Sequence, residues 1–559
     1  MMKRWELSPK KIWLLVLYGG AFAALTIFLF WKCRYGYANN DESFYLTIPY
    51  RMCQGDGLVI HEWHLSQLSA LPLYPAVRLY LWVFGSTEGI LLRFRLLFTL
   101  CWALSALFFC YRLRKFSLPG AMLASLAYLI YAPFGIMALS YNSMGILFLT
   151  NACVLFATAE RKRHLQCLFA GIFLANAILC CPYLVLLYLV FLVVSICRWK
   201  KDGLGDFGMV TLGCLAMLAV LCICLLRHAS IPELVRAFPE LFNDPEHGNL
   251  SLLQKTRTYF EKIWECNRFF GPCFLAAVLV TILSKLLKKP GIGLAVLCVL
   301  AAIVELGFLI ENPYLNYVMF PISLLAPCLA LHSRDKAIRL PFWLLWIPGL
   351  VYTYCIHLSS NQKFYAISSA ATVMTVATIV MLVGYLEGRL RESGKKACTY
   401  VFTVAAAALL GLQFYAEISL RYSSVFWEEG GMAAQTVRAK SGPEKGILMT
   451  KEKLEKYRTQ EKNVALIRKD PEIQKVLFLS RNTRLYLSTE KEMATYSAWL
   501  SGVDKKSVKR LDTYFQLCPD KWPDAIYIES LYTEFAAHYE KLGYEATVLD
   551  SGAVLLKRK

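Results

Sequence analysis

The chain alternates between long apolar runs and short polar connections over its first three quarters, and then its pattern changes. Thirteen apolar runs precede residue 418, most of them near the ~20 residues that a helix needs to cross a bilayer, whereas residues 418–559 read as a soluble sequence. The runs are 12–31, 92–111, 118–138, 142–159, 165–181, 182–197, 207–226, 269–287, 291–310, 314–331, 341–358, 364–386 and 397–417. The pattern predicts an α-helical polytopic membrane protein with about 13 transmembrane helices.

The tail predicts a small α/β domain, because short apolar strands alternate in it with helical segments. The expected elements are strands at Lys475–Ser480, Ala525–Glu529 and Ala546–Leu556, the last with a turn at Ser551-Gly552, and helices near 504–515 and 531–542. We therefore divide the chain into a transmembrane domain, residues 1–417, and a C-terminal domain, residues 418–559.

Composition and charge agree with this division. The chain is 57% hydrophobic and 18% charged, against roughly 45–50% and 25% for soluble proteins, which excludes a cytosolic enzyme and a disordered chain. The net charge of +20 does not indicate a nucleic-acid partner, because the N-terminus and six alternate loops carry three or four Lys or Arg each, whereas the four short opposite loops carry only Lys363. This bias places the basic side in the cytoplasm.

An odd number of spans puts the two ends of the chain on opposite faces of the membrane. The N-terminus is then cytoplasmic, and the C-terminal domain lies outside the cytoplasm, together with segments 32–91 and 227–268. We expect a multi-pass protein of the cell membrane.

The first outer segment, 32–91, has the most unusual composition. Asp41 and Glu42 come about ten residues after the first run, residues 43–53 form an amphipathic pattern, and 72–84 is apolar but too short to span. Two helices lying along the interface would hold both acids near the lipid headgroups. The alternative is that Asp41 caps the first of these helices and Glu42 lies in its first turn.

The loop between these two helices mixes acidic, imidazole, indole and amide groups beside an apolar surface. Glu62, Trp63, His64 and Gln67 are candidate ligands for a sugar, whose ring packs on aromatic faces while its hydroxyls bond to polar groups. His61 and His64 share one helical face, so a divalent metal is possible, although no third ligand is obvious and a polar loop is the alternative. No cofactor is otherwise predicted.

Three basic residues of this segment could meet a phosphate. They are Arg51, Arg78 and Arg93. Contact with lipid headgroups is the alternative interpretation.

The order of these features resembles the GT-C superfamily of integral-membrane glycosyltransferases, which includes the protein O-mannosyltransferases and the lipid A aminoarabinose transferases. The matching features are the Asp-Glu pair after one span, the interfacial helices with Pro72-Leu73-Tyr74-Pro75, Glu88 to Arg93 before the second span, Asn316 to Pro321 at the start of a late span, and the extracytoplasmic C-terminal domain. The resemblance covers residues 1–200 well and the remainder only by topology. The chain departs from it at Ala70-Leu71, where many members have Lys-Pro, and at Ser140-Tyr141-Asn142, where a second acid is common.

The resemblance implies an inverting glycosyltransferase that uses a polyprenyl-phosphate-linked sugar donor and a lipid, glycan or protein acceptor. Asp41 would act as the general base, and Glu42 would shape the site. Segment 227–268, with Leu234, Phe238 and Phe242 four residues apart, would form a further interfacial helix or a lid.

Two alternatives remain open. One is a transporter or flippase of lipid-linked saccharides, which would place ionisable groups or broken helices at mid-membrane. The other is a non-catalytic membrane scaffold.

Overall fold

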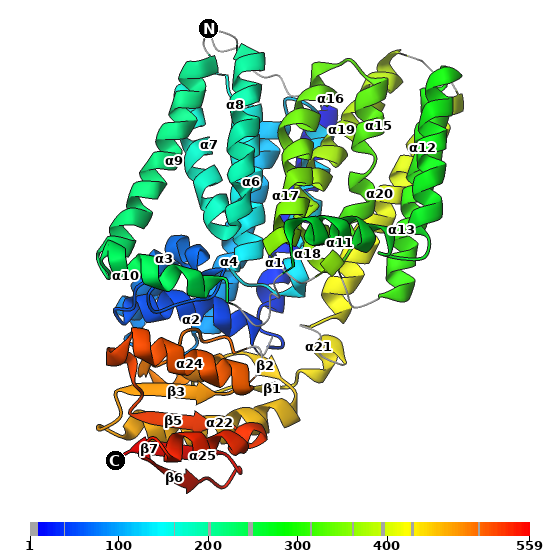
Figure 1. The fold of residues 1–559 in the computed structure, drawn as a ribbon. Coiled ribbons are helices and arrows are strands. Elements are labelled where there is room, and N and C mark those ends of the chain that lie inside the picture. The colour runs from blue at the N-terminus through cyan, green and yellow to red at the C-terminus, as the bar shows by residue number, and fades with distance from the viewer. Residues whose placement is uncertain are drawn as a thin grey trace.

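The computed structural model describes residues 9–37, 40–160, 163–199, 203–243, 250–312, 316–359, 363–392, 397–425, 430–500 and 503–559. The chain forms a helical bundle, and a smaller domain built around a β-sheet lies against one end of it (Figure 1). The mostly helical fold with a small C-terminal α/β region agrees with the fold class predicted from the sequence.

Eight helical segments of the described residues are long and apolar enough to cross a membrane, as expected of a multi-pass membrane protein. They are α1 (Pro9–Lys32), α4 (Ile90–Leu113), α7 (Arg163–Cys180), α9 (Gly203–Leu226), α13 (Pro290–Glu311), the run of α16 (Lys336–Pro341), η6 (Phe342–Trp346) and α17 (Ile347–Ser359), α19 (Thr372–Glu392) and α20 (Ala397–Ser423).

Five shorter apolar helical segments account for the other predicted runs. They are α5 (Leu118–Ile130), α6 (Tyr141–Ala157), η3 (Pro182–Val185) with α8 (Leu186–Trp199), α12 (Phe270–Leu286), and α14 (Met319–Ser323) with α15 (Ala326–His332). Each predicted run therefore contains a helix among the described residues, while a total of thirteen membrane crossings stays a prediction.

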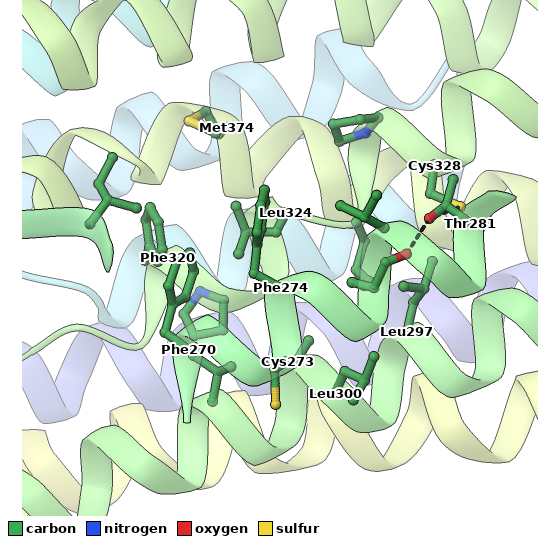
Figure 2. Close-up of a pocket in the computed structure, with 18 of the residues that line it drawn as sticks. Phe270, Cys273, Phe274, Thr281, Leu297, Leu300, Phe320, Leu324, Cys328 and Met374 are labelled. Carbon is green, nitrogen blue, oxygen red and sulfur yellow. Dashed lines mark hydrogen bonds between the residues drawn. The ribbon is translucent and has the colours of Figure 1, made fainter. Parts of the chain in front are cut away.

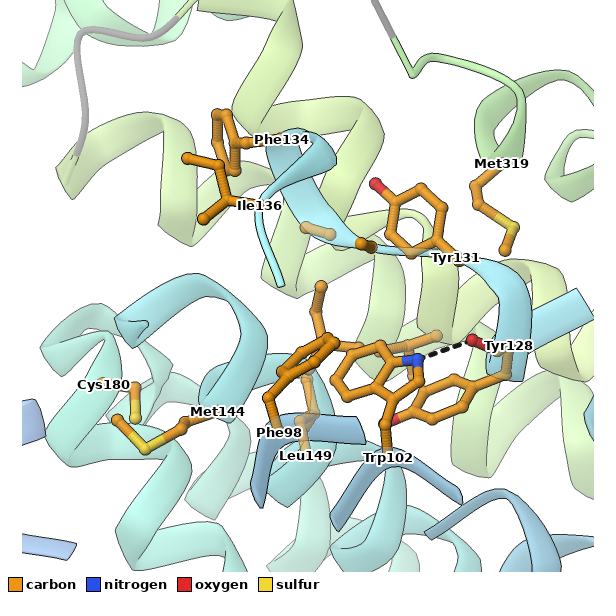
Figure 3. Packing of buried hydrophobic residues seen from close by; sticks show 14 of the residues in the cluster. Phe98, Trp102, Tyr128, Tyr131, Phe134, Ile136, Met144, Leu149, Cys180 and Met319 are labelled. Atoms are coloured by element: carbon orange, nitrogen blue, oxygen red, sulfur yellow. Dashed lines mark hydrogen bonds between the residues drawn. The ribbon is translucent and has the colours of Figure 1, made fainter. Parts of the chain in front are cut away.

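Aromatic side chains fill the core of the bundle where α4, α5 and α6 meet. The ring of Trp102 stacks on Tyr128 at a centroid distance of 4.2 Å, and its Nε1 donates a hydrogen bond of 2.6 Å to the Tyr128 carbonyl oxygen. Phe98 stacks on the same indole (Figure 3). The Trp102 N–H thus has the partner that a buried indole requires.

Several short helices lie toward the end of the bundle that faces the C-terminal domain (Figure 1). They are α2 (Asp41–Cys53), η1 (Gln67–Ser69), α3 (Ala70–Phe84), α10 (Ile231–Ala237), η5 (Phe238–Leu241), α11 (Leu252–Trp264) and α18 (Lys363–Ala370). Helix α3 exposes Leu79, Trp82, Val83 and Phe84, as an interfacial helix would. Helix α2 differs from the expectation, because nearly all of its side chains are buried between the bundle and the C-terminal domain.

The C-terminal domain contains a five-stranded mixed sheet of order β4-β3-β5-β7-β6, in which β3 is parallel to β4 and β5, and β7 is antiparallel to β5 and β6. Its strands are β3 (Lys475–Leu479), β4 (Glu492–Met493), β5 (Ala525–Ile528), β6 (Tyr544–Val548) and β7 (Val554–Arg558), and β1 (Val437–Arg438) pairs separately with β2 (Leu448–Met449). Its helices are α21 (Gly431–Ala434), α22 (Lys451–Lys469), α23 (Arg484–Thr489), α24 (Lys505–Leu517), η7 (Pro519–Lys521), η8 (Ser530–Phe535) and α25 (Ala536–Glu540).

Two details of this domain refine the expectations from the sequence. The apolar stretch at 546–556 divides into β6 and β7 at the predicted turn, where Gly552 adopts a φ of 76° that favours glycine. The helix expected over 531–542 is instead a 3-10 segment, η8, followed by the short helix α25. The last bundle helix, α20, continues to Ser423, so the domain boundary drawn at residue 417 falls inside a helix.

Topology is testable by cysteine labelling. The end of α1 at Lys32 lies beside the C-terminal domain, since Tyr35 pairs with Leu448, so an outer C-terminal domain requires a cytoplasmic start of α1. A cysteine introduced at the exposed Lys506 should react with a membrane-impermeant maleimide in intact cells, above the background of the parental chain. A cysteine at Lys285, in a predicted cytoplasmic loop, is the matched control and should react only after permeabilisation. Labelling of the Lys506 position only after permeabilisation would place the C-terminal domain in the cytoplasm and invert the predicted topology.

Candidate functional site

The two adjacent acids at the start of α2 have different surroundings. The Glu42 side chain is buried and receives hydrogen bonds on both carboxylate oxygens from the guanidinium of Arg95 on α4, with 2.7 Å between Nη2 and Oε2. Arg95 also donates to the carbonyl oxygens of Cys33 at 2.8 Å and Gly36 at 2.7 Å. This ion pair fixes α2 against α4 and against the end of α1.

Asp41 is partly exposed and is the first residue of α2. Asn40 occupies the position that precedes the helix, so Asp41 lies in the first turn and is not the cap. Burial raises the pKa of the Tyr45 phenol well above its ordinary value, and the nearby Asp41 carboxylate and Tyr141 raise it further. Tyr365 of α18 also interacts electrostatically with Asp41. The carboxylate thus lies near Tyr45 of its own helix and Tyr365 of α18.

Sequence reasoning missed Arg95, although Arg93 was singled out two residues earlier. A signal was present, because an arginine surrounded by Phe94, Leu96 and Leu97 in an apolar run needs a buried anionic partner. The sequence does not say that Glu42 is that partner.

The loop that follows α2 contains a buried network of charges. Arg51 donates to Asp56 at 2.9 Å, to Glu62 at 2.7 Å and to the Thr495 carbonyl oxygen at 3.0 Å. Lys521 of the C-terminal domain pairs with Asp56 at 2.5 Å. Burial would raise the pKa of Asp56, but Arg51 and Lys521 outweigh it, so the pKa is lowered. These contacts join the loop to the C-terminal domain, and a role of Arg51 or Glu62 in ligand binding stays a prediction.

Trp63 and Gln67 are also buried in the contact between the loop and the C-terminal domain. The Trp63 ring stacks on Tyr496 with 5.8 Å between centroids, and its backbone N–H donates to the Tyr496 carbonyl oxygen at 2.7 Å. Gln67 Oε1 accepts a hydrogen bond of 2.6 Å from the backbone N–H of Val59. Val59 has a φ of 70°, a conformation that is strained for a β-branched residue. Gln67 therefore stabilises a strained turn of the loop.

His64 is partly exposed and belongs to an aromatic group beside Asp41. Its ring meets the edge of Phe44 at 4.7 Å, and Phe44 contacts Trp499 of the C-terminal domain at 5.4 Å. The Nδ1 atom accepts a hydrogen bond of 3.1 Å from the Ser66 N–H, so a neutral ring carries its proton on Nε2. Trp499, which sequence reasoning did not single out, brings the C-terminal domain to within one turn of Asp41 along α2.

His61 does not share this position. Burial lowers its pKa to about 4, and its Nδ1 accepts a hydrogen bond of 2.8 Å from the Gly57 N–H. Over the ranges that the structure describes, no three His, Cys, Asp or Glu side chains are grouped to hold a metal ion.

Arg78 on α3 and Arg93 near the start of α4 are both exposed. Arg78 donates to the Tyr74 hydroxyl at 2.9 Å, and the Arg93 guanidinium lies over the Phe84 ring at 4.3 Å from its centroid. Both neighbour the exposed apolar side chains of α3. Contact with lipid headgroups and phosphate binding by these two residues both stay predictions.

An apolar cavity of about 430 Å³ lies among α11, α12, α13, α14, α15, α17 and α19. Phe270 and Phe320 lie toward one end, Thr281 and Cys328 lie toward the other, and Phe274 lies between them (Figure 2). Its volume falls in the range of small-molecule sites, ~300–1,000 Å³. The almost entirely apolar lining suits a hydrocarbon chain.

An aromatic layer extends from this cavity toward Asp41. Phe320, which lines the cavity, meets Phe364 at 5.0 Å, and Phe364 meets Tyr317 at 5.1 Å. Tyr317 in turn meets Tyr365 at 5.4 Å, and Tyr365 interacts with Asp41. A ligand whose apolar part fills the cavity would therefore meet aromatic rings on its way to the carboxylate.

Helix α11 covers the cavity on the side of the C-terminal domain. Tyr259 and Ile263 line the cavity, and the Tyr259 hydroxyl bonds to Thr353 at 2.7 Å. The opposite face exposes Leu253, Phe260 and Trp264. This amphipathic helix supports the expectation of an interfacial helix in segment 227–268, and a lid function stays a prediction.

Comparisons with known proteins returned structural similarities only. No model of a protein family matches the sequence, and no curated protein matches it either. The oligosaccharyltransferase AglB of Archaeoglobus fulgidus, in complex with an inhibitory peptide and a dolichol-phosphate, aligns with 100% of this chain and 75% of its own at 11% identity and a TM-score of 0.46. The zinc and sulfate complex of the oligosaccharyltransferase from that organism aligns with 94% of this chain and 69% of its own at 11% identity and a TM-score of 0.48.

A third similar structure is ArnT of Cupriavidus metallidurans bound to undecaprenyl phosphate. It aligns with 97% of this chain and 97% of its own at 14% identity and a TM-score of 0.45. These scores are too low to assign a family or an activity to this chain.

Replacing Arg95 should lower the stability of the protein against unfolding. Arg95→Met leaves the Glu42 carboxylate buried without a cation, which typically costs ~3–5 kcal/mol. Thermal and denaturant unfolding of the purified protein in detergent would measure the loss. Arg93→Met on the same helix removes an exposed arginine and is the matched control, with an expected loss of about 1 kcal/mol or less.

The double variant Glu42→Gln with Arg95→Met removes both charges and should recover part of the lost stability. Equal stability of Arg95→Met and Arg93→Met would show that the ion pair does not hold α2 in place.

Proposed function

We propose that the chain is a membrane glycosyltransferase that moves a sugar from a polyprenyl-phosphate-type donor to an acceptor at the outer face of the membrane, with Asp41 as the general base. The observation that carries this proposal is that the two adjacent acids have different surroundings. Glu42 is buried and held by Arg95, whereas Asp41 is partly exposed at the start of the same helix. Of the pair, Asp41 is therefore the acid that can meet an acceptor.

In the proposed reaction, a hydroxyl or amine of the acceptor attacks the anomeric carbon of the sugar and gives its proton to the Asp41 carboxylate. The bond from that carbon to the phosphate oxygen breaks, polyprenyl phosphate leaves, and the configuration is inverted. A carboxylate is a weak base, with an ordinary pKa of ~3.9, so catalysis depends on its placement within hydrogen-bond reach of the acceptor. Tyr45 stays protonated at neutral pH and can donate a hydrogen bond there.

The apolar cavity and the aromatic layer support a lipid-linked donor. In this arrangement the polyprenyl chain occupies the cavity, and the sugar lies near Tyr365 and Asp41. Arg78 and Arg93 are the proposed contacts for the phosphate, since both are exposed beside the apolar face of α3. The leaving phosphate is already charged, so cationic side chains can stabilise it.

For the acceptor we propose a pocket that includes His64 and Trp499, both partly exposed beside Phe44. Glu62, Trp63, Gln67 and Arg51 are assigned to this pocket as positioning residues, because their contacts hold the loop that carries His64. The identity of the acceptor is open among lipid, glycan and protein.

The central test is Asp41→Asn, assayed as transfer from a lipid-linked donor by the purified protein. Transfer should fall by ~10²–10⁴-fold, because asparagine keeps the size of the side chain but cannot accept a proton. Donor affinity should stay the same, since the chain and the phosphate contact other residues. Stability should change by no more than ~1 kcal/mol, the usual worth of a charge in the first turn of a helix.

A transporter or a scaffold has no need of a base at Asp41. Wild-type transfer by Asp41→Asn would therefore contradict the mechanism, and would remove the main support for the proposed activity.

The proposal that the cavity holds the lipid chain leads to a separate prediction about donor binding. Ala301 lines the cavity on α13, so Ala301→Phe fills part of the volume and should weaken binding of a polyprenyl-phosphate donor by at least about tenfold, since each lost buried CH₂ contact is worth ~0.8 kcal/mol. Val299→Phe adds a ring to the exposed face of the same helix and should bind the donor as the wild type does. Equal affinities of the two variants would place the lipid chain elsewhere.

A further inference from the structure

Two carboxyl groups are buried inside the bundle where α13 meets α20, away from the residues proposed for catalysis. The side chains of Glu305 on α13 and Glu417 on α20 are both 0% exposed, and the two groups interact electrostatically. Neither oxygen of Glu305 has a hydrogen-bond partner among the described residues. An ionised carboxylate in such a place is costly unless a cation compensates it.

Two amides near these carboxyl groups also have buried oxygen atoms without a hydrogen-bond partner among the described residues. Asn316 uses its Nδ2 to reach Glu417 Oε2 at 3.5 Å, and Gln413, one turn before Glu417 on α20, uses its Nε2 to reach the sulfur of Met319 at 3.6 Å. The Asn316 Oδ1, Gln413 Oε1 and Glu417 Oε1 atoms are buried and have no hydrogen-bond partner within the described ranges. Four side chains therefore contribute five buried oxygen atoms that lack a donor.

The basic groups nearby do not donate hydrogen bonds to these oxygen atoms. Arg421 lies one turn beyond Glu417 on α20, but among the described residues it forms no ion pair within 4.0 Å, and its Nε and Nη2 atoms have no acceptor. Lys32 donates instead to the carbonyl oxygens of Arg421 and Ser424 at the C-terminal end of α20. If both carboxyl groups are ionised, two carboxylates and one guanidinium leave one uncompensated negative charge.

We propose that Glu305, Glu417, Asn316 and Gln413 bind one small monovalent metal cation. The ligands are all oxygen atoms, which suits hard cations and disfavours zinc or copper. A single positive charge matches the net charge of the cluster. A proton on one carboxyl group would serve one of the acceptors and leave the others without a donor.

A cation bound at this position would connect three helices of the bundle. Asn316 directly precedes Tyr317, whose ring packs on Phe364 and Tyr365. The cation would thus fix the start of α14 against α13 and α20, below the aromatic layer. This inference does not depend on the proposed transferase activity, because a bound ion would be detected in a protein of any function.

Thermal unfolding of the full chain in detergent tests the proposal, with sodium or potassium chloride titrated against choline chloride at constant ionic strength. The melting temperature of the wild type should rise by several degrees and saturate, as expected for a ligand that binds only the folded state. Glu305→Gln should lose this response. In choline chloride it should melt at or above the wild-type temperature, because it no longer buries an uncompensated charge.

Glu311→Gln is the matched control, since Glu311 ends the same helix and pairs with Arg268 at 3.0 Å. It should respond to the metal cation as the wild type does. Gln413→Leu keeps the packing volume but removes one oxygen ligand, so it should need a several-fold higher cation concentration for half of the effect.

Three results would overturn the proposal. They are equal melting temperatures in metal and choline salts, a full response in Glu305→Gln, and a wild-type stability that follows pH but not the metal cation. The last result would assign a proton to the cluster.

Discussion

The ion pair between Glu42 and Arg95 is the constraint on which the arrangement of the region next to the C-terminal domain depends. Both side chains are buried, and the guanidinium reaches both carboxylate oxygens as well as the backbone carbonyl oxygens at the end of α1. In a region of low dielectric constant, either charge alone would be strongly destabilising, so the two must remain together. One contact therefore fixes α1, α2 and α4 relative to one another, and with them the position of Asp41.

The geometry of a helix then separates the roles of two adjacent acids. Successive residues project about 100° apart around an α-helix of 3.6 residues per turn. When Glu42 faces Arg95 in the bundle, Asp41 is directed away from it, toward Tyr45 and Tyr365. The acid that holds the structure together and the acid proposed for catalysis are thus determined by one orientation of α2.

The C-terminal domain completes this region and is more than an appended module. Its residues Lys521 and Tyr496 hold the loop after α2 through Asp56 and Trp63, and its Trp499 lies near His64 through their shared contact with Phe44. The buried charges of the loop are each matched by an opposite charge from another segment, as burial requires. Helix α2 is therefore enclosed from both sides and does not lie along the lipid surface as an isolated interfacial helix would.

The sequence by itself determined the helical runs, the strands β3, β5, β6 and β7 of the C-terminal domain and the unusual segment 32–91, because length, apolar content and alternation are local properties of the chain. Tertiary structure alone decided which charges are paired. Arg93 and Arg95 look alike in sequence, yet one is exposed and the other is buried against Glu42. Likewise, Arg421 looks like part of the soluble tail in the sequence, yet α20 carries it into the bundle. The partner of a buried charge lies far away along the chain, so its identity depends on packing that no local pattern encodes.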